Sequence, residues 1–262
     1  MSITLTPFFE NDLCQGFTWT VPNEDLLAEQ IAIIALGNSH HVQRILAGAG
    51  VKHANVNLEA AKDAIRLLTV PKDDSSQRDG WIFQCISWIA AHQATPNGII
   101  VTPQMVLAQK GFDGMQIEID TTSNKISAVI IFEDKATVNA RTTITGKVWP
   151  EFRKLEAGER TNEVTAQVIG LLQGVPLIDR DEAIENILWK EARRYRVSVT
   201  ITDTPDNSEG RKSLFAGYDQ VAANPVERRR GETFLVPNLR AWMQTIADKA
   251  IAAINAKVAA NV

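Results

Sequence analysis

Apolar residues recur every three or four positions in several stretches of the chain, which is the spacing of an amphipathic or buried helix. These stretches cover residues 24–36, 56–68, 81–93, 161–172 and 239–254. Asn23 and Asn238 stand directly before two of them, where an asparagine side chain commonly caps a helix. Helical spacing also continues to residue 195 after the break "QGVPLIDRD". The pattern therefore predicts helices at both ends of the chain and in its middle.

Shorter apolar runs, some of which alternate with polar residues, predict strands. They lie at 99–101, 115–119, 126–132, 197–203 and 233–237. The polar segment 70–80 separates the first helices from the region in which strands and helices alternate. We therefore predict an α/β protein with a helical N-terminal lobe over residues 1–75, which serves docking or regulation. An α/β core that ends in the C-terminal helix follows over residues 76–262.

Composition narrows the classes of protein that fit. The 262 residues are 45% hydrophobic and 22% charged, which suits a globular protein in water, and no run approaches the roughly 18 apolar residues of a membrane span. Glu10 and Asp12 interrupt the region where a signal peptide would be apolar, so we expect a cytoplasmic location. Cys14 and Cys85 form neither a disulfide framework nor a zinc motif. The net charge of −4 does not indicate a stand-alone nucleic-acid binder.

One apolar run ends abruptly in charge. Residues 126–132 lead directly into Glu133, Asp134 and Lys135, and Asp113 stands twenty residues before Glu133. Because side chains two positions apart share a face of a strand, Glu133 and Lys135 should project together. Asp134 should point to the opposite face, and its side chain is expected to contribute least.

A hairpin between residues 115 and 135 would bring Asp113 close to this charged end. The segment "TTSN" at 121–124 has a common hairpin-loop length. With Asp120 opposite Lys125, Asp113 falls opposite residue 132, and a shift by one residue places it opposite Glu133. Directly opposed residues of an antiparallel pair lie about 5 Å apart. The alternatives are a strand end that carries mixed charges and a site for a divalent cation.

Two carboxylates are a common protein contribution to a Mg²⁺ site, which keeps water and phosphate oxygens as its remaining ligands. A lysine beside such a site can orient an attacking water molecule and offset charge on a phosphate. The combination of two acids and one lysine at a strand end therefore indicates hydrolysis of a phosphate ester.

The residues "FDG" at 112–114 and "IIFEDK" at 130–135 resemble the D…(D/E)xK signature of the PD-(D/E)xK, or restriction-endonuclease-like, nucleases. The resemblance covers residues 77–205 and implies a restriction-endonuclease-like core, a mixed sheet flanked by helices. It also implies Asp113 and Glu133 as ligands of Mg²⁺ or Mn²⁺, Asp134 as a further ligand through its carbonyl, and Lys135 as the catalytic lysine. "GFDG" ahead of E-x-K is similar to nuclease subunits of bacterial anti-phage systems such as Hachiman.

The chain departs from this family at three points. Phe112 stands where the family name has proline. The helix 81–93 lacks the glutamate that many members carry, so Gln84 and Gln93 are the candidate polar substitutes. The Q-x-x-x-Y motif of one branch is also missing, with Glu163 and Gln167 in its place. The number of metal ions therefore stays open.

The expected function is metal-dependent cleavage of DNA by an endonuclease that acts as the effector of an anti-phage complex. A helicase or another ATPase is the expected partner, because the chain has no G-x-x-x-x-G-K-[ST] motif of its own. The alternative is a catalytically inactive nuclease-fold subunit that serves binding or scaffolding. Basic residues are weak candidates for phosphate contacts, the alternative being solvated surface. They are Arg141, Lys147, Arg193, Arg194 and Arg229.

Overall fold

The computed structural model describes residues 1–49, 56–70, 74–107, 111–120, 122, 125–173, 192–223 and 225–260. Within these ranges, seven strands form one mixed sheet in the order β1-β2-β7-β6-β5-β4-β3. The predicted α/β class is therefore confirmed. The helical pattern predicted up to residue 195 lies outside the described residues over 174–191, as does most of the "TTSN" loop, and residues 193–195 begin a strand instead.

The strands are β1 (Thr4–Glu10), β2 (Cys14–Thr20), β3 (Ile99–Ile100), β4 (Gly114–Asp120), β5 (Lys125–Lys135), β6 (Arg193–Ile201) and β7 (Arg229–Leu235). The pairs β1/β2, β3/β4 and β4/β5 are antiparallel, whereas β5/β6, β6/β7 and β2/β7 are parallel. The middle strands β5 and β6 are buried along most of their length. Such continuous burial is expected where helices cover both faces of a sheet.

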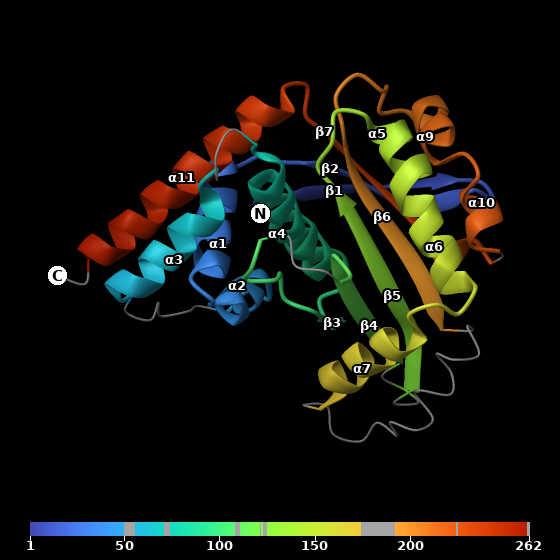
Figure 1. Ribbon diagram of the computed structural model, residues 1–262, viewed down its shortest axis with the longest axis horizontal. Helices are drawn as coiled ribbons and strands as arrows, with labels where there is room; N and C mark the ends of the chain where they lie inside the picture. The colour runs from blue at the N-terminus through green and yellow to red at the C-terminus, as the bar shows by residue number, and fades with distance from the viewer. Residues whose placement is uncertain are drawn as a thin grey trace.

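Helices cover both faces, and each face has its own hydrophobic cluster. On one face lie α1 (Glu24–Ala35), α2 (Ser39–Leu46), α3 (Leu58–Leu68), α4 (Ser76–Ala94) and α11 (Leu239–Ala259). On the other lie α5 (Ala140–Thr143), a π-helical turn (Ile144–Val148), α6 (Trp149–Glu156), α7 (Thr161–Leu172), α9 (Ser208–Phe215) and α10 (Tyr218–Val221). A short 3₁₀ turn (Val226–Arg228) precedes β7. Figure 1 shows α1, α3 and α11 grouped beyond α4, and α5 and α6 at the opposite side of the sheet.

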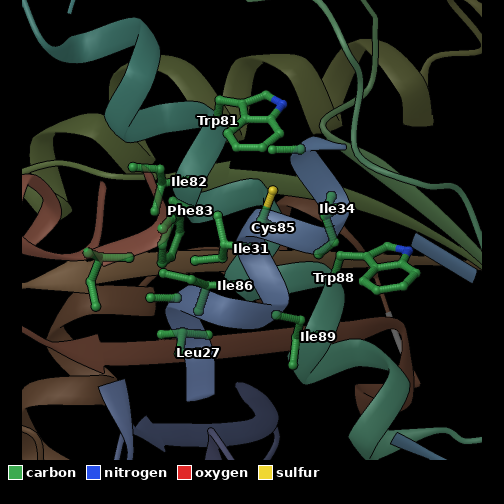
Figure 2. Packing of buried hydrophobic residues seen from close by; sticks show 14 of the residues in the cluster. Leu27, Ile31, Ile34, Trp81, Ile82, Phe83, Cys85, Ile86, Trp88 and Ile89 are labelled. Atoms are coloured by element: carbon green, nitrogen blue, oxygen red, sulfur yellow. The ribbon is translucent and has the colours of Figure 1, made fainter. Parts of the chain in front are cut away.

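Helix α4 is the central helix of the first layer. Its apolar residues are buried against β5 on one side and against α1, α3 and α11 on the others. Figure 2 shows Ile82, Ile86 and Ile89 of α4 lying among Leu27 and Ile31 of α1. A helix that is apolar on nearly all sides is expected in such a position. Its burial fixes α4 relative to β5, whose charged end it approaches.

The N-terminal part differs from the prediction. Residues 1–20 do not belong to a helical lobe, because they form β1 and β2, and β2 pairs in parallel with β7. Gly16 allows this pairing, since a Cβ at this position would lie 1.8 Å from the carbonyl oxygen of Gly231. The helices predicted at 24–36 and 56–68 are confirmed, and Asn23 caps α1 by accepting a hydrogen bond from the amide of Leu26.

The segment 70–80, predicted as a linker, ends inside α4, which begins at Ser76. Residues of α1 and α3 also share one hydrophobic cluster with α4 and α11. The parts before and after residue 75 are therefore packed together. None of the helices in the described ranges combines the length and apolar character that a membrane span requires.

Candidate active site at the end of strands β4 and β5

The hairpin of β4 and β5 places Asp113 opposite Glu133. Asp120 pairs with Lys125, as the loop length predicts, but the register shifts by one residue next to Glu118. Beyond this irregularity Gly114 pairs with Phe132, so the next position along each strand brings Asp113 and Glu133 together. A β-bulge of this kind adds one residue to one strand and changes which side chains oppose each other.

Lys135 joins the two acids. Its Nζ lies 2.7 Å from Oδ2 of Asp113 and 2.8 Å from Oε2 of Glu133. The two carboxylate oxygens therefore cannot be farther apart than these two distances combined. The three side chains are 21%, 9% and 24% exposed for Asp113, Glu133 and Lys135, respectively, so the cluster is largely buried but open on one side. The sequence-predicted catalytic residues are thus brought together at one point.

Asp113 is held from two further directions. Its Oδ2 also accepts a hydrogen bond from the backbone amide of Asp134 at 2.9 Å. Its Oδ1 accepts one from Nε2 of Gln84, on α4, at 2.9 Å. Gln84 therefore lies at the site, as expected for a polar substitute on this helix. These bonds fix the orientation of the Asp113 carboxylate although the residue precedes β4 rather than belonging to it.

The site carries more negative than positive charge. Burial raises the pKa of Glu133 well above its usual range, because the ammonium of Lys135 only partly offsets the desolvation and Asp113 adds like charge. Burial would lower the pKa of Lys135, but the carboxylates of Asp113 and Glu133 outweigh it and raise that pKa. Lys135 therefore remains a cation between two acids.

The side chain of Asp134 points to the opposite face, as predicted, and it makes a buried contact there. It is buried against α4, where its Oδ1 accepts a hydrogen bond of 2.8 Å from the hydroxyl of Ser87. Burial raises the pKa of Asp134 to about 6, against the opposing charge of Arg196. This side chain therefore has a structural contact, since it connects β5 to α4 one helical turn beyond Gln84, and the expectation that it contributes least to the site stays a prediction.

A cavity of about 170 Å³ lies over Asp113. Its lining combines the first turns of α4 with the segment before β4 and includes Gln77, Trp81, Gln84 and Gln104. The cavity gives the Asp113 side of the cluster a polar approach from solvent. A water molecule or part of a small polar group fits this volume, since one water takes about 30 Å³ of liquid.

Arg160 approaches the cluster from the opposite layer. Its guanidinium carbon lies 4.2 Å from the centre of the Phe112 ring, directly before Asp113 in the chain. The hydrogen bond to Glu163 raises the pKa of Arg160, with smaller contributions from Glu151 and Glu133. Glu163 is thus bonded to Arg160 on the surface. Gln167, two turns into α7, has a buried Oε1 without a hydrogen-bond partner.

Two of the predicted phosphate contacts are not on the surface, and this part of the prediction is wrong. Arg193 is 2% exposed, and its Nη1 donates to the carbonyl of Leu155. Arg229 is fully buried, and its guanidinium donates to carbonyls that include that of Ala222. Arg193 thus connects β6 to the end of α6, and Arg229 connects β7 to the end of α10, because a buried guanidinium needs acceptors for its donors.

The other three basic candidates differ in their surroundings. Arg141 donates to the carbonyls of Leu214 and Ala216, which anchors α5 to the end of α9. Arg194 forms an ion pair with Glu118 at 3.3 Å, on the face of the sheet that carries α4. Lys147 is exposed. Of the five candidates, Lys147 is therefore the one that the structure leaves open to solvent.

The side chains of the cluster offer two carboxylates to a divalent cation. No group of three or more histidine, cysteine, aspartate or glutamate side chains that could hold a metal ion occurs in the described part of the chain. Two carboxylates, however, converge on one point, and Mg²⁺ is commonly held by one or two carboxylates together with water and phosphate oxygens. Asp113 and Glu133 thus fit such an ion, whereas the Asp134 carboxylate faces α4 and cannot join them.

Ser87 and Arg160 were missed by the sequence reasoning as neighbours of the site. Ser87 stands among apolar residues of a helix, where a small hydroxyl gives little signal. Arg160 lies 25 residues beyond Lys135, and its contact with Phe112 depends on how α7 folds back. Comparison of the chain with protein-family models, curated proteins and solved structures gives no significant match. The geometry alone therefore carries the functional argument.

Proposed function

We propose that the chain is a metal-dependent nuclease with a restriction-endonuclease-like core, which hydrolyses phosphodiester bonds of DNA at the Asp113–Glu133–Lys135 cluster. The observation that carries the proposal is the convergence of two carboxylate oxygens on one nitrogen of Lys135. The order of elements also supports it. The restriction-endonuclease-like nucleases that the sequence resembles have the order αβββαβ. In this chain, helix α4 is followed by the antiparallel strands β3, β4 and β5, by the helices α5 to α7, and then by β6 parallel to β5.

Each residue has a distinct part in this proposal. Asp113, held by Gln84 and the amide of Asp134, presents one fixed oxygen to the site. Glu133 presents the second, and a divalent cation bound there would polarise the phosphate and activate water. Lys135 stabilises negative charge that develops on the phosphate and orients the attacking water, as a positioned cation does in phosphoryl transfer.

The test is cleavage of supercoiled plasmid DNA by the purified full chain with Mg²⁺ or Mn²⁺. Glu133→Gln and Lys135→Met should each lower the rate at least ~10²-fold, since each removes a group that acts on the transition state. Lys62→Met is the matched control, because Lys62 is an exposed lysine on α3 that pairs with Glu59. Cleavage that survives both substitutions at the site would refute the proposal. A labelled RNA strand assayed in parallel decides between DNA and RNA.

A partner belongs to this proposal. An effector with an acidic overall charge needs another protein to deliver nucleic acid, and a helicase or ATPase subunit of an anti-phage complex fits that need. Addition of the products of neighbouring genes to the plasmid assay tests this part. A rate that does not change with any of them would argue for a nuclease that acts alone.

A second candidate is a catalytically inactive nuclease-fold subunit that binds or scaffolds. The observation that favours it is Gln84, a neutral residue that occupies the α4 side of Asp113. The same assay separates the two functions. DNA binding with no cleavage in either metal, unchanged by Lys135→Met, would favour the scaffold.

A further inference from the structure

Arg160 has an unusual backbone for its residue type. Its φ of 58° lies in the left-handed region, and besides Asn11 it is the one non-glycine residue in the described ranges with a positive φ. It stands in the turn between α6 and α7, directly before Thr161. A side chain in this region is strained and persists where its surroundings hold it. The turn thus directs a long cationic side chain at one place.

That place is the edge of the acid cluster. The guanidinium carbon lies 4.2 Å from the centre of the Phe112 ring, and Phe112 immediately precedes Asp113. The ring holds the cation by a cation–π contact, which uses none of the N–H donors of the guanidinium. Two of these donors now bond to Glu163, whose Oε2 lies 3.0 Å from Nε and 2.8 Å from Nη2. Glu151 adds a longer contact of 3.7 Å.

The carboxylate of Glu163, which accepts these hydrogen bonds, is exposed. The side chain of Glu163 is 50% exposed and that of Arg160 is 24% exposed, so this ion pair is open to solvent. Exposed ion pairs contribute little net free energy and exchange readily with other anions. A phosphate presents two oxygens in a geometry that a guanidinium binds as well as it binds a carboxylate. Glu163 therefore marks the position that a phosphate of the substrate can take.

The other cationic side chains near the site are engaged by carboxylates and are less available to bind a phosphate. Lys135 is engaged by Asp113 and Glu133. Arg196 is 1% exposed and pairs with Glu232 inside the sheet layer. A polyanionic backbone that approaches two acids requires a cation at the surface beside them. Arg160 occupies that position.

We infer that Arg160 binds a backbone phosphate of the nucleic acid next to the acid cluster, and that Glu163 holds the guanidinium until the phosphate replaces it. The inference rests on the proposed function for its choice of ligand. Its test, however, measures binding in the absence of divalent metal and does not depend on cleavage.

The experiment measures fluorescence anisotropy of a short labelled DNA duplex with the full chain over a series of salt concentrations. Arg160→Asn is the main variant, because asparagine tolerates the left-handed backbone that this position needs. We expect affinity to fall roughly five-fold or more on several DNA sequences alike, and the slope of log affinity against log salt to decrease by about 1. Arg160→Lys should lie between the two, since it keeps the charge but loses the planar fork.

Two controls separate a phosphate contact from a general effect of charge. Arg44→Asn removes an exposed arginine from α2, on the other side of the sheet, and should leave both affinity and slope unchanged. Glu163→Gln should raise the affinity, whereas Glu159→Gln, a neighbouring exposed position, should raise it less. When Arg160→Asn is already present, Glu163→Gln should raise the affinity for DNA no more than Glu159→Gln does. Circular dichroism establishes that each variant is folded.

The outcomes decide the inference without reference to catalysis. It is overturned if Arg160→Asn behaves like Arg44→Asn, if Glu163→Gln acts equally with and without Arg160, or if the chain binds no DNA. If Arg160→Asn does not fold, Arg160→Lys and Glu163→Gln decide instead. The inference then requires that Arg160→Lys lowers the affinity for DNA and that Glu163→Gln raises it. Binding that depends on Arg160 without any cleavage in Mg²⁺ or Mn²⁺ would support this inference while the proposed nuclease activity fails.

Discussion

Two ion pairs of equal length test how much burial decides the energy of a charge pair in this protein. Arg196 and Glu232 lie 2.7 Å apart with side chains that are 1% and 3% exposed. Arg66 and Asp63 also lie 2.7 Å apart, but their side chains are 78% and 71% exposed. Removal of one partner from the buried pair leaves an uncompensated charge, which costs about 3–5 kcal/mol. The exposed pair contributes about 0.5 kcal/mol or less.

Glu232→Ala and Asp63→Ala are the matched changes. We expect Glu232→Ala to lower the free energy of unfolding by about 3–5 kcal/mol, a large part of the roughly 5–15 kcal/mol of a typical domain. Asp63→Ala should lower it by about 0.5 kcal/mol at most. Urea titration followed by tryptophan fluorescence measures both, and Arg196 lies 5.3 Å from the Trp19 ring, so the probe is local. Equal losses in the two variants would refute the reasoning.

The double variant Arg196→Met with Glu232→Leu extends this test. Replacement of a buried pair by apolar residues is often neutral or stabilising. Here we expect only partial recovery relative to Glu232→Ala, because the charge of Arg196 also acts on the buried carboxyl group of Asp134. Full recovery would show that Asp134 does not depend on Arg196.

Three further predictions concern other parts of the molecule. Burial lowers the pKa of His92 to about 4. Since an unfolded histidine titrates near 6.5, the contribution of His92 to stability should fall by about 3 kcal/mol as the pH drops from about 6.5 to 4. Urea titrations of the wild type and of His92→Gln should therefore show a stability difference that changes with pH by this amount, and a difference independent of pH would contradict it. Gly16→Ala should lower the melting temperature sharply, because the added Cβ would meet the carbonyl of Gly231. Gly146→Ala is the control and should not lower it, because a Cβ there meets nothing within 4 Å. Equal shifts of the melting temperature in the two variants would be inconsistent with this packing. Burial raises the pKa of the Cys85 thiol well above its usual range, so alkylation should require unfolding, and rapid modification of the native chain would disprove this burial.

The meeting of Asp113, Glu133 and Lys135 could be predicted from the sequence, but whether Asp113 lies opposite residue 132 or residue 133 could not. The acids, the lysine and the loop length are local features, and together they predict that the ends of one hairpin meet. The irregularity next to Glu118, which decides that Asp113 opposes Glu133, depends on packing against β3 and β6. A bulge leaves no reliable sequence signal in an apolar strand. The α/β class followed from periodicity for the same local reason.

Buried polar residues mark the limit of such prediction. Nothing in the sequence distinguishes Arg193 and Arg229 from surface arginines, because their acceptors include carbonyls distant in sequence, those of Leu155 and Leu13, respectively. The partner of Asp134 is a serine on a helix 47 residues earlier. Whether a charge is buried depends on such partners rather than on its neighbours in the chain. The strands β1 and β2 were not predicted for a related reason, since "TLTPFFE" joins the sheet only through "CQGFTWT", whose other neighbour, β7, lies about two hundred residues further along the chain.

The pairing of β2 with β7 has a consequence for the order in which the molecule folds. The hairpin of β4 and β5 needs only contacts within some twenty residues, whereas β2 must wait for a strand about two hundred residues further along the chain. Contacts of such long sequence separation form late, because the intervening chain loses entropy before the contact is made. During synthesis, the hairpin of β1 and β2 therefore lacks its connection to the rest of the sheet until β7 is complete. Pulse-labelled hydrogen exchange should show the amides shared by β4 and β5 protected before those that β2 shares with β7.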